Sequence, residues 1–263
     1  MAAGSAAAAS VMLAGRALGQ SGGVRAEGHP MPGGVELPDT PPRPKRADSV
    51  GYAIVGLGGY ALNQMMPRFE RAERAHIAAL VSGNPDKLNK VGDAYGVPAG
   101  SRYSYDNFAE IASNESVDAV YIVLPSGLHA EWTEKAFAAG KHVLCEKPMA
   151  LSSAECERMI AAAQRANRRL MIAYRCHFEP YNMQAMELMD QDAVGTLRMI
   201  RGEQSYRMGP TTPAENWRVN RALGGRGPLE DYGIYGLQAA LYLSGEMPES
   251  VAAASYQPAG DPR

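Results

Sequence analysis

The chain has 263 residues, of which 46% are hydrophobic and 21% are charged, an ordinary globular balance that suits one large domain or two smaller ones. Its formal net charge of -2 offers no positive field for nucleic acid or an anionic membrane surface, so neither is expected as a partner. The three cysteines include no C-x-x-C motif, which argues against a disulfide framework and against a thiolate metal site.

The first fifty residues, a leader and arm, differ in composition from the rest. Residues 2–19 are rich in alanine, glycine and serine and are too short and too weakly apolar to span a bilayer. They resemble the second half of a secretory signal, although no basic segment precedes them. Six prolines between residues 28 and 48 favour an extended segment, either a disordered leader or an arm along another surface, such as a second subunit. We therefore expect a periplasmic protein, or a cytoplasmic one if the leader is not an export signal.

From residue 51 to residue 174, short apolar runs alternate with helical segments. This alternation predicts an α/β domain with a doubly wound parallel sheet, the Rossmann arrangement that binds dinucleotides. Strands are predicted at 53–55, 76–82, 119–124, 143–145 and 170–173, and helices from about residue 61 and at 85–95, 131–139 and 152–167.

The regularity changes after residue 174. The pattern predicts one long strand at 197–208, a helix at 228–243 and the start of a strand at 250–256. These elements indicate the start of an α+β domain at 175–263, with a large and mostly antiparallel sheet for substrate binding and oligomerisation. Because so few strands cannot complete a sheet, we expect this second domain to be truncated.

A glycine-rich turn, Gly56-Leu57-Gly58-Gly59-Tyr60-Ala61, joins the first predicted strand to the first helix. Gly56 permits the tight turn, Gly58 lets the backbone approach a pyrophosphate, and Ala61 lets the helix pack close to the strand. Free N–H groups at the start of the helix favour phosphate binding. The turn therefore predicts a dinucleotide site.

The end of the second predicted strand indicates which dinucleotide binds. Enzymes that prefer NAD usually carry Asp or Glu there, which binds the ribose 2′-hydroxyl. Here the strand runs into Ser82-Gly83-Asn84, and Lys87 follows. Serine and lysine can bind a 2′-phosphate that a carboxylate would repel. The sequence favours NADP, unless Lys87 is an ordinary solvated residue of a helix.

Three further residues form a candidate catalytic set. Lys147 follows an apolar strand and precedes Pro148, which keeps the lysine out of helical geometry. Ligands of α/β sheets bind outside the carboxyl ends of the strands, so Lys147 is expected in the cleft beside the cofactor. Asp231 and Tyr235 are four residues apart in the helix predicted at 228–243, which places them on one face.

Seven segments, in this order along the chain, carry a family resemblance. They are G-Y-A-I-V-G-L-G-G-Y-A-L-N-Q (51–64), A-L-V-S-G-N (79–84), D-A-V-Y-I-V-L-P (118–125), A-G-K-H-V-L-C-E-K-P-M-A (139–150), L-M-I-A-Y-R-C-H (170–177), Trp217-Arg218 and D-Y-G-I-Y-G-L (231–237). The chain resembles the glucose-fructose oxidoreductase family, within the wider group that also holds inositol dehydrogenases. Tyr235 is typical of the sugar-oxidoreductase branch, because most relatives in the wider group carry histidine there.

The resemblance implies an NADP-dependent sugar oxidoreductase that needs no metal. Tyr235, helped by Lys147 beside the nicotinamide and oriented by Asp231, would remove the hydroxyl proton while a hydride leaves C1 of an aldose. The tightly held cofactor would then reduce a second sugar. The cofactor-binding residues that the resemblance implies are Gly56, Leu57, Gly58, Gly59, Tyr60, Ser82, Lys87, Tyr105, Leu124, Ser126, His129, Glu146, Lys147, Arg175, Trp217 and Arg218.

Two alternatives stay open at this point. One is an ordinary NAD(P)-dependent sugar or polyol dehydrogenase that releases its cofactor, since Gly59 and Asp48-Ser49 stand where the family carries positive charge near the phosphates. The other is a catalytically incompetent fragment that only binds nucleotide. The full-length form is expected to be a homo-oligomer.

Overall fold

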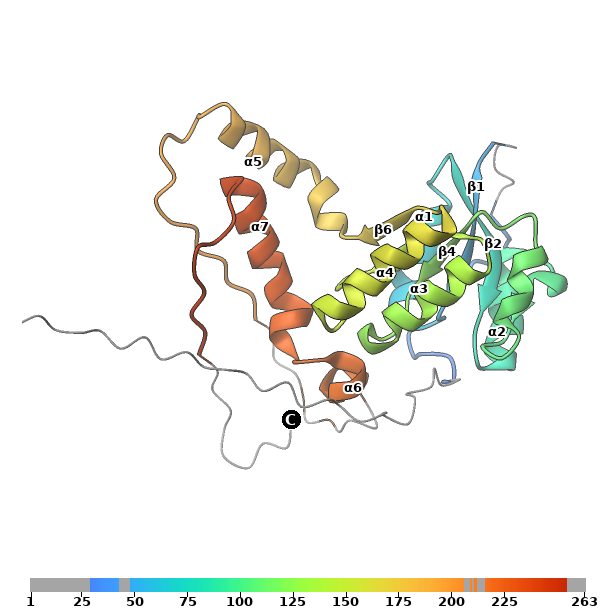
Figure 1. The fold of residues 1–263 in the computed structure, drawn as a ribbon. Coiled ribbons are helices and arrows are strands. Elements are labelled where there is room, and N and C mark those ends of the chain that lie inside the picture. Colours follow the sequence, from blue (N-terminus) through green and yellow to red (C-terminus); the bar gives the residue numbers. More distant parts are fainter. Residues whose placement is uncertain (1–28, 43–47, 206–208, 210, 212–215, 255–263) are drawn as a thin grey trace, which may run out of the picture.

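The computed structural model describes residues 29–42, 48–205, 209, 211 and 216–254. The expected export signal at 2–19 lies outside them. The centre of the fold is a six-stranded sheet in the order β3-β2-β1-β4-β5-β6, in which every neighbouring pair is parallel (Figure 1). The strands are β1 Val50–Val55, β2 Ala75–Val81, β3 Arg102–Tyr103, β4 Ala119–Ile122, β5 His142–Glu146 and β6 Leu170–Ala173.

The predicted doubly wound sheet is therefore confirmed. The strand order reverses between β1 and β4, the switch point beside which ligands of such sheets bind. The sequence pattern gave no sign of β3, which is two residues long and pairs with the end of β2.

Helices cover both faces of the sheet. One face is covered by α1 Met66–Phe69, which continues a π-helical turn at Ala61–Met65, and by α2 Pro85–Tyr95. The other face is covered by α3 His129–Ala138 and α4 Ser153–Ala166. Successive strand residues point to opposite faces, so Ile54 packs with the first pair of helices and Val55 with the second. Short 3₁₀ turns complete this part of the chain: η2 Ala99–Ser101, η3 Phe108–Ser113, η4 Ser126–Leu128 and η5 Arg175–Phe178.

Local signals set the ends of these helices. The Asn84 side chain caps α2 by accepting from the backbone N–H of Lys87, and Gly96 ends the helix with a positive φ of 66°. Ser152 caps α4 in the same way. No helix in the part of the chain that the structure describes is long and apolar enough to cross a membrane.

The proline-rich arm packs against the chain's own nucleotide-binding domain where it is described. Met31, Val35 and Leu37 contact the apolar cluster beneath α1 and α2. Pro32 lies near Gly59 of the glycine-rich turn, and Pro41 lies against Gly96. Residues 29–42 thus lie along the surface of the chain's own nucleotide-binding domain.

The C-terminal segment is helical where it is regular. It contains α5 Pro180–Asp190, η6 Trp217–Val219, α6 Arg221–Gly224, a π-helical turn Leu229–Gly233 and α7 Ile234–Ser244. The helix predicted at 228–243 is confirmed, although its first turn is π-helical. Figure 1 shows α5 and α7 beside one end of the sheet domain.

Both strands predicted in this segment are wrong for the described residues. Residues 197–205 and 250–254 form no strand, and the remainder of each prediction lies outside the described residues. A strand exists only through hydrogen bonds to a neighbouring strand, and no described segment pairs with either. Residues 197–205 instead pass α7 so closely that a Cβ on Gly202 would lie 3.3 Å from the Cα of Gly236.

Candidate active site

The predicted site residues converge on one edge of the sheet. The strands end in register, since Val55 pairs with Ile122, Ile122 with Cys145, and Cys145 with Ile172. The segments that follow β1, β2, β4, β5 and β6 therefore emerge at the same edge. They carry the glycine-rich turn, Ser82 and Lys87, Leu124 and Ser126, Glu146 and Lys147, and Arg175.

The glycine-rich turn after β1 has the geometry of a phosphate cradle. Gly56 has a φ of +95°, and a Cβ there would lie 2.4 Å from the carbonyl oxygen of Val123, so no other residue fits. A Cβ on Gly58 would meet nothing within 4 Å, which leaves open space against that backbone. Leu57 is buried and anchors the turn, whereas Tyr60 is partly exposed. The turn thus fits a dinucleotide pyrophosphate.

Ser82, Lys87 and Tyr105 lie around the end of β2. Ser82 is buried, and its hydroxyl accepts from the backbone N–H of Asn84 at 3.3 Å. Burial raises the pKa of Tyr105 to about 12. A hydrogen bond with the Gly83 backbone lowers this pKa, but by less than burial raises it. Lys87 is only 7% exposed, and this burial lowers its pKa, so it is not the solvated lysine of the alternative interpretation. A buried ammonium group is a suitable partner for a 2′-phosphate.

Lys147, Asp231 and Arg218 form one charged cluster. The Lys147 ammonium donates to the Asp231 carboxylate at 2.8 Å and to the Asp231 backbone carbonyl at 2.6 Å. The Arg218 Nε donates to the other carboxylate oxygen at 3.1 Å. The Lys147 and Asp231 side chains are 15% and 20% exposed, so the pair is partly shielded from water. These charge-assisted bonds fix the lysine at the end of β5.

Tyr235 lies one helical turn after Asp231 and faces the same cluster. The Lys147 Nζ lies 4.8 Å from the centroid of the Tyr235 ring and 5.7 Å from that of Tyr232. The ammonium group thus sits over the rings as a cation–π partner. The Tyr235 ring also packs against Tyr174, with 5.6 Å between the centroids. The structure therefore brings the three predicted catalytic residues together, with Lys147 against the ring of Tyr235.

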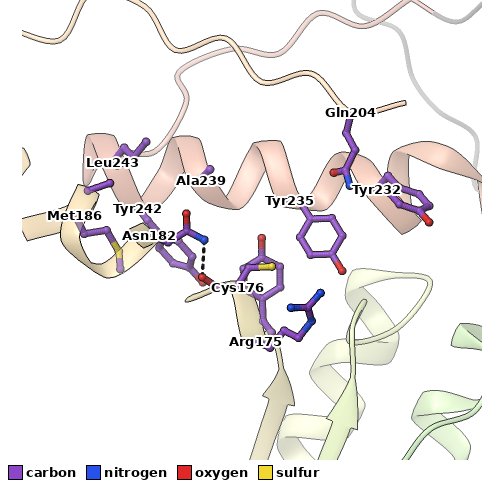
Figure 2. Close-up of a pocket in the computed structure, with 12 residues that line it drawn as sticks. Arg175, Cys176, Asn182, Met186, Gln204, Tyr232, Tyr235, Ala239, Tyr242 and Leu243 are labelled. Atoms are coloured by element: carbon purple, nitrogen blue, oxygen red, sulfur yellow. Dashed lines mark hydrogen bonds between the residues drawn. The ribbon is translucent and has the colours of Figure 1, made fainter. Parts of the chain in front are cut away.

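A pocket of about 520 Å³ opens beside Tyr235, within the size range of sites for small molecules (Figure 2). Tyrosine rings and several polar side chains surround it, and Gln204 reaches it from the segment that crosses α7. Its lining residues are Tyr174, Arg175, Cys176, Asn182, Ala185, Met186, Gln204, Tyr232, Tyr235, Ala239, Tyr242 and Leu243.

Glu146 is held by a partner that the sequence analysis missed. The Tyr121 hydroxyl donates to one Glu146 carboxylate oxygen at 2.5 Å, and the backbone N–H of Lys147 donates to the other at 3.2 Å. Both side chains are buried, and this burial raises the pKa of each. The available signal was a tyrosine inside the apolar strand β4, because a buried phenol hydroxyl usually requires a hydrogen-bond partner.

Replacing Glu146 by glutamine is expected to stabilise the fold increasingly as pH rises. Burial raises the folded-state pKa of Glu146 above its unfolded value of about 4.3, so its protonated form favours folding. That contribution is present below about pH 4.3 and is lost as pH rises through the folded-state pKa. Glu146→Gln keeps an acceptor for Tyr121 but cannot ionise. Urea unfolding measured from about pH 4.3 upward should show that the gain in unfolding free energy of the variant over the parent protein grows with pH. The exposed Glu131→Gln on α3 is the control, and an equal pH dependence there would contradict the prediction.

Leu124, Ser126 and His129 lie deeper than the open part of the site. Leu124 and Ser126 are buried, and His129 is 1% exposed. The two ring nitrogens of His129 lie 2.9 Å from the Leu124 carbonyl oxygen and 2.7 Å from that of Pro148. Burial lowers the pKa of His129. This histidine therefore ties together the loops after β4 and β5, and both of its nitrogens are already in contact with protein.

Arg218 reaches the site through Asp231, next to the place where α6 docks on the loop after β4. A Cβ on Gly127 would lie 2.1 Å from the Ala222 carbonyl oxygen, so this close approach requires glycine. The guanidinium of Arg218 stacks over the Trp217 ring, 4.5 Å from its centroid. Gly127 is a second residue that the sequence analysis missed.

Two family models match successive parts of the chain. The model described as "Oxidoreductase family, NAD-binding Rossmann fold" matches residues 50–174, and the model of the GFO/IDH/MocA C-terminal domain matches residues 182–261. The chain belongs to the GFO/IDH/MocA family. The family resemblance predicted from its motifs is thereby confirmed.

Several proteins similar to this chain have names that refer to a sugar or to NADP. A crystal structure of aldose-aldose oxidoreductase from Caulobacter crescentus, complexed with glycerol, is 49% identical, with a TM-score of 0.73 over 76% of this chain and 59% of that one. D-xylose 1-dehydrogenase [NADP(+)] from Haloarcula marismortui is 30% identical over 84% of this chain and 61% of the relative. The 3-ketoreductase KijD10 from Actinomadura kijaniata, in complex with NADP and TDP-benzene, is 26% identical, with a TM-score of 0.61 over 74% of this chain and 57% of that one. The chain thus spans about three fifths of the length of these relatives.

Proposed function

We propose that this chain carries the cofactor site and the catalytic residues of an NADP-dependent sugar oxidoreductase. The observation that carries the proposal is the cluster of Lys147, Asp231 and Tyr235 at the sheet edge that also holds the glycine-rich turn. The named activities of the aldose-aldose oxidoreductase and the xylose dehydrogenase support the same reaction class.

The residues at the sheet edge fit the parts of NADP. The glycine-rich turn would hold the pyrophosphate, since Gly58 leaves its backbone open to a ligand. Ser82, Lys87 and Tyr105 would hold the adenosine end and its 2′-phosphate. Glu146 and Lys147 would lie near the nicotinamide. When bound, the nicotinamide would supply the chemistry of hydride acceptance from C1 of an aldose.

The side chains of the cluster would manage the proton. Tyr235, in its phenolate form, would accept the proton of the C1 hydroxyl as general base. Asp231 would hold the Lys147 ammonium in place, and Lys147 would bind the sugar oxygen and keep the hydroxyl in line with Tyr235. The pocket beside Tyr235 would take the rest of the sugar, with Gln204 available to its hydroxyl groups.

Two forms of the reaction are distinguished by whether the cofactor leaves. In the first, bound NADPH reduces a second sugar, which the similarity to an aldose-aldose oxidoreductase favours. In the second, NADPH dissociates, as in an ordinary dehydrogenase, which the uncharged Gly59 beside the phosphate cradle favours. An absorption spectrum of the purified protein decides between them. Co-purifying nicotinamide supports the first form, whereas nucleotide-free protein that binds added NADP supports the second.

Lys87→Ala is expected to weaken NADP binding and leave NAD binding unchanged. Loss of a charged hydrogen bond to the 2′-phosphate should cost about 1.5–3 kcal/mol, roughly a 10- to 150-fold rise in Kd. Titration of both nucleotides measures this, and the exposed Lys90→Ala on the same helix is the matched control. Equal affinity of the parent chain for NADP and NAD would contradict the assignment.

We also propose self-association and a periplasmic location, as expected from the sequence. Self-association is supported by apolar side chains of α5 and α7 that are open to solvent: Tyr181 is 79% exposed, Leu237 58% and Met183 51%. The periplasmic location rests on the composition of residues 2–19 alone.

A further inference from the structure

Arg175 lies where η5 begins, directly after β6, and is held close to α7. Its neighbour Tyr174 packs its ring against that of Tyr235 and, at 6.2 Å between centroids, near that of Tyr242. This contact sets the start of η5 against the helix that carries Tyr235. Figure 2 shows the Arg175 guanidinium beside the hydroxyl end of Tyr235, at the border of the pocket.

Lys147 occupies a different position relative to the same phenol. Its ammonium group lies over the ring face of Tyr235 and donates both to the carboxylate and to the carbonyl of Asp231. The positive charge of Lys147 is therefore partly balanced by Asp231, whose carboxylate also accepts from Arg218. Among the described residues, Arg175 forms no ion pair that would balance its charge in the same way.

The surroundings of Tyr235 include Arg175, which favours ionisation of the phenol, and several groups that oppose it. Burial raises the pKa of Tyr235, the Cys176 thiol raises it further, and Arg175 lowers it. The carboxylates of Glu146 and Asp231 also raise it. The charged and titratable groups that face Tyr235 are Tyr60, Glu146, Lys147, Tyr174, Arg175, Cys176, Asp231 and Tyr232.

Arg175 also contacts the glycine-rich turn. A side-chain hydrogen bond with Arg175 lowers the pKa of Tyr60, although burial and nearby Glu146 raise it overall. Tyr60 is the last residue of the turn before the first helix. One guanidinium group thus connects the turn that would hold the pyrophosphate with the tyrosine that would take the proton.

We propose that Arg175 is a positioning residue whose guanidinium group, and not the Lys147 ammonium, stabilises the ionised form of Tyr235. The inference rests on the proposed role of Tyr235 as general base and extends it. A cation beside a phenol oxygen favours the phenolate, whereas a cation already paired to a carboxylate and lying over the ring face does so less.

The test measures the ionisation of residue 235 directly and does not depend on turnover. A fluorinated tyrosine that ionises near neutral pH is incorporated at position 235, and its ¹⁹F resonance is followed against pH. Arg175→Met should raise the pKa of that phenol by about one unit, at the low end of the shift that a nearby opposite charge produces. Arg175→Lys should restore most of the shift, because the charge remains. Arg158→Met on the exposed face of α4 is the control and should leave the titration unchanged.

The competing interpretation is that Lys147 stabilises the ionised form of Tyr235. It is tested by the double variant Lys147→Met/Asp231→Asn, which removes both charges of the pair. It should shift the titration of residue 235 less than Arg175→Met does. An unchanged titration in Arg175→Met, or a larger shift in the double variant, would overturn the proposal. If Arg175→Met shifts the titration as expected but the pH profile of kcat does not follow, the role of Tyr235 as base fails while its pairing with Arg175 stands.

Discussion

Replacing Tyr235 by phenylalanine is expected to lower kcat by roughly 10²–10⁴-fold, the usual contribution of a positioned proton acceptor. The variant loses only the hydroxyl and keeps the ring that packs against Tyr174 and lies under the Lys147 ammonium. Cofactor affinity should therefore stay at the parental value. Steady-state rates across pH, with NADP affinity measured in parallel, separate the two effects.

The other two members of the cluster provide graded controls for this prediction. Lys147→Met should also lower kcat, because it removes the ammonium group nearest to the ring of Tyr235. Asp231→Asn should cost less than either, since the Asp231 backbone carbonyl still accepts from Lys147 at 2.6 Å. Near-parental turnover in Tyr235→Phe would exclude the tyrosine as base and move the choice to another group of the pocket.

Replacing two glycines of the glycine-rich turn, Gly56 and Gly58, is expected to have different effects on stability and on NADP binding. Gly56→Ala should destabilise the fold by about 2–4 kcal/mol, because its φ of +95° strains any side chain and its Cβ would meet the Val123 carbonyl oxygen at 2.4 Å. Gly58→Val should leave stability nearly unchanged, since nothing lies within 4 Å of an added Cβ. It should nevertheless raise the Kd for NADP at least tenfold, about 1.4 kcal/mol, by filling the space that the pyrophosphate needs.

Urea unfolding and NADP titration of both variants measure these outcomes. A stable Gly56→Ala protein would contradict the geometry of the turn. Unchanged NADP affinity in Gly58→Val would show that the open space beside Gly58 does not hold the cofactor.

The nucleotide-binding domain could be predicted closely because its signals are local. The helix predicted at 85–95 and the strand at 170–173 have the observed bounds, and Asn84 and Gly96 mark the two ends of that helix. The strand β3 had no such signal, because two residues carry no pattern and are held by pairing with Leu80 and Val81. The strands predicted at 197–208 and 250–256 failed where they are described because a strand depends on a pairing partner as well as on its own residues.

The features of the site likewise include some that the local sequence predicts and others that depend on contacts between distant residues. The turn after β1 and the spacing of Asp231 and Tyr235 are short-range features that the sequence displays. The contact between Lys147 and Asp231 joins residues that are 84 positions apart, and the hydrogen bond from Tyr121 to Glu146 joins two strands. Sequence spacing alone gives neither contact, nor does it reveal that the Arg175 guanidinium lies beside the hydroxyl end of Tyr235. Such directions follow from how η5, α6 and α7 pack on the sheet edge.

Transfer of an isotope label tests the proposed reaction most directly. The protein is incubated with NADP⁺ and an aldose that carries deuterium at C1, and the nucleotide is then analysed by mass spectrometry, with Tyr235→Phe in parallel. The account predicts that deuterium appears in NADPH in the parent protein and at a much lower rate in the variant. Absence of the label from both the nucleotide and any reduced second sugar, or NADPH without the label, would contradict it.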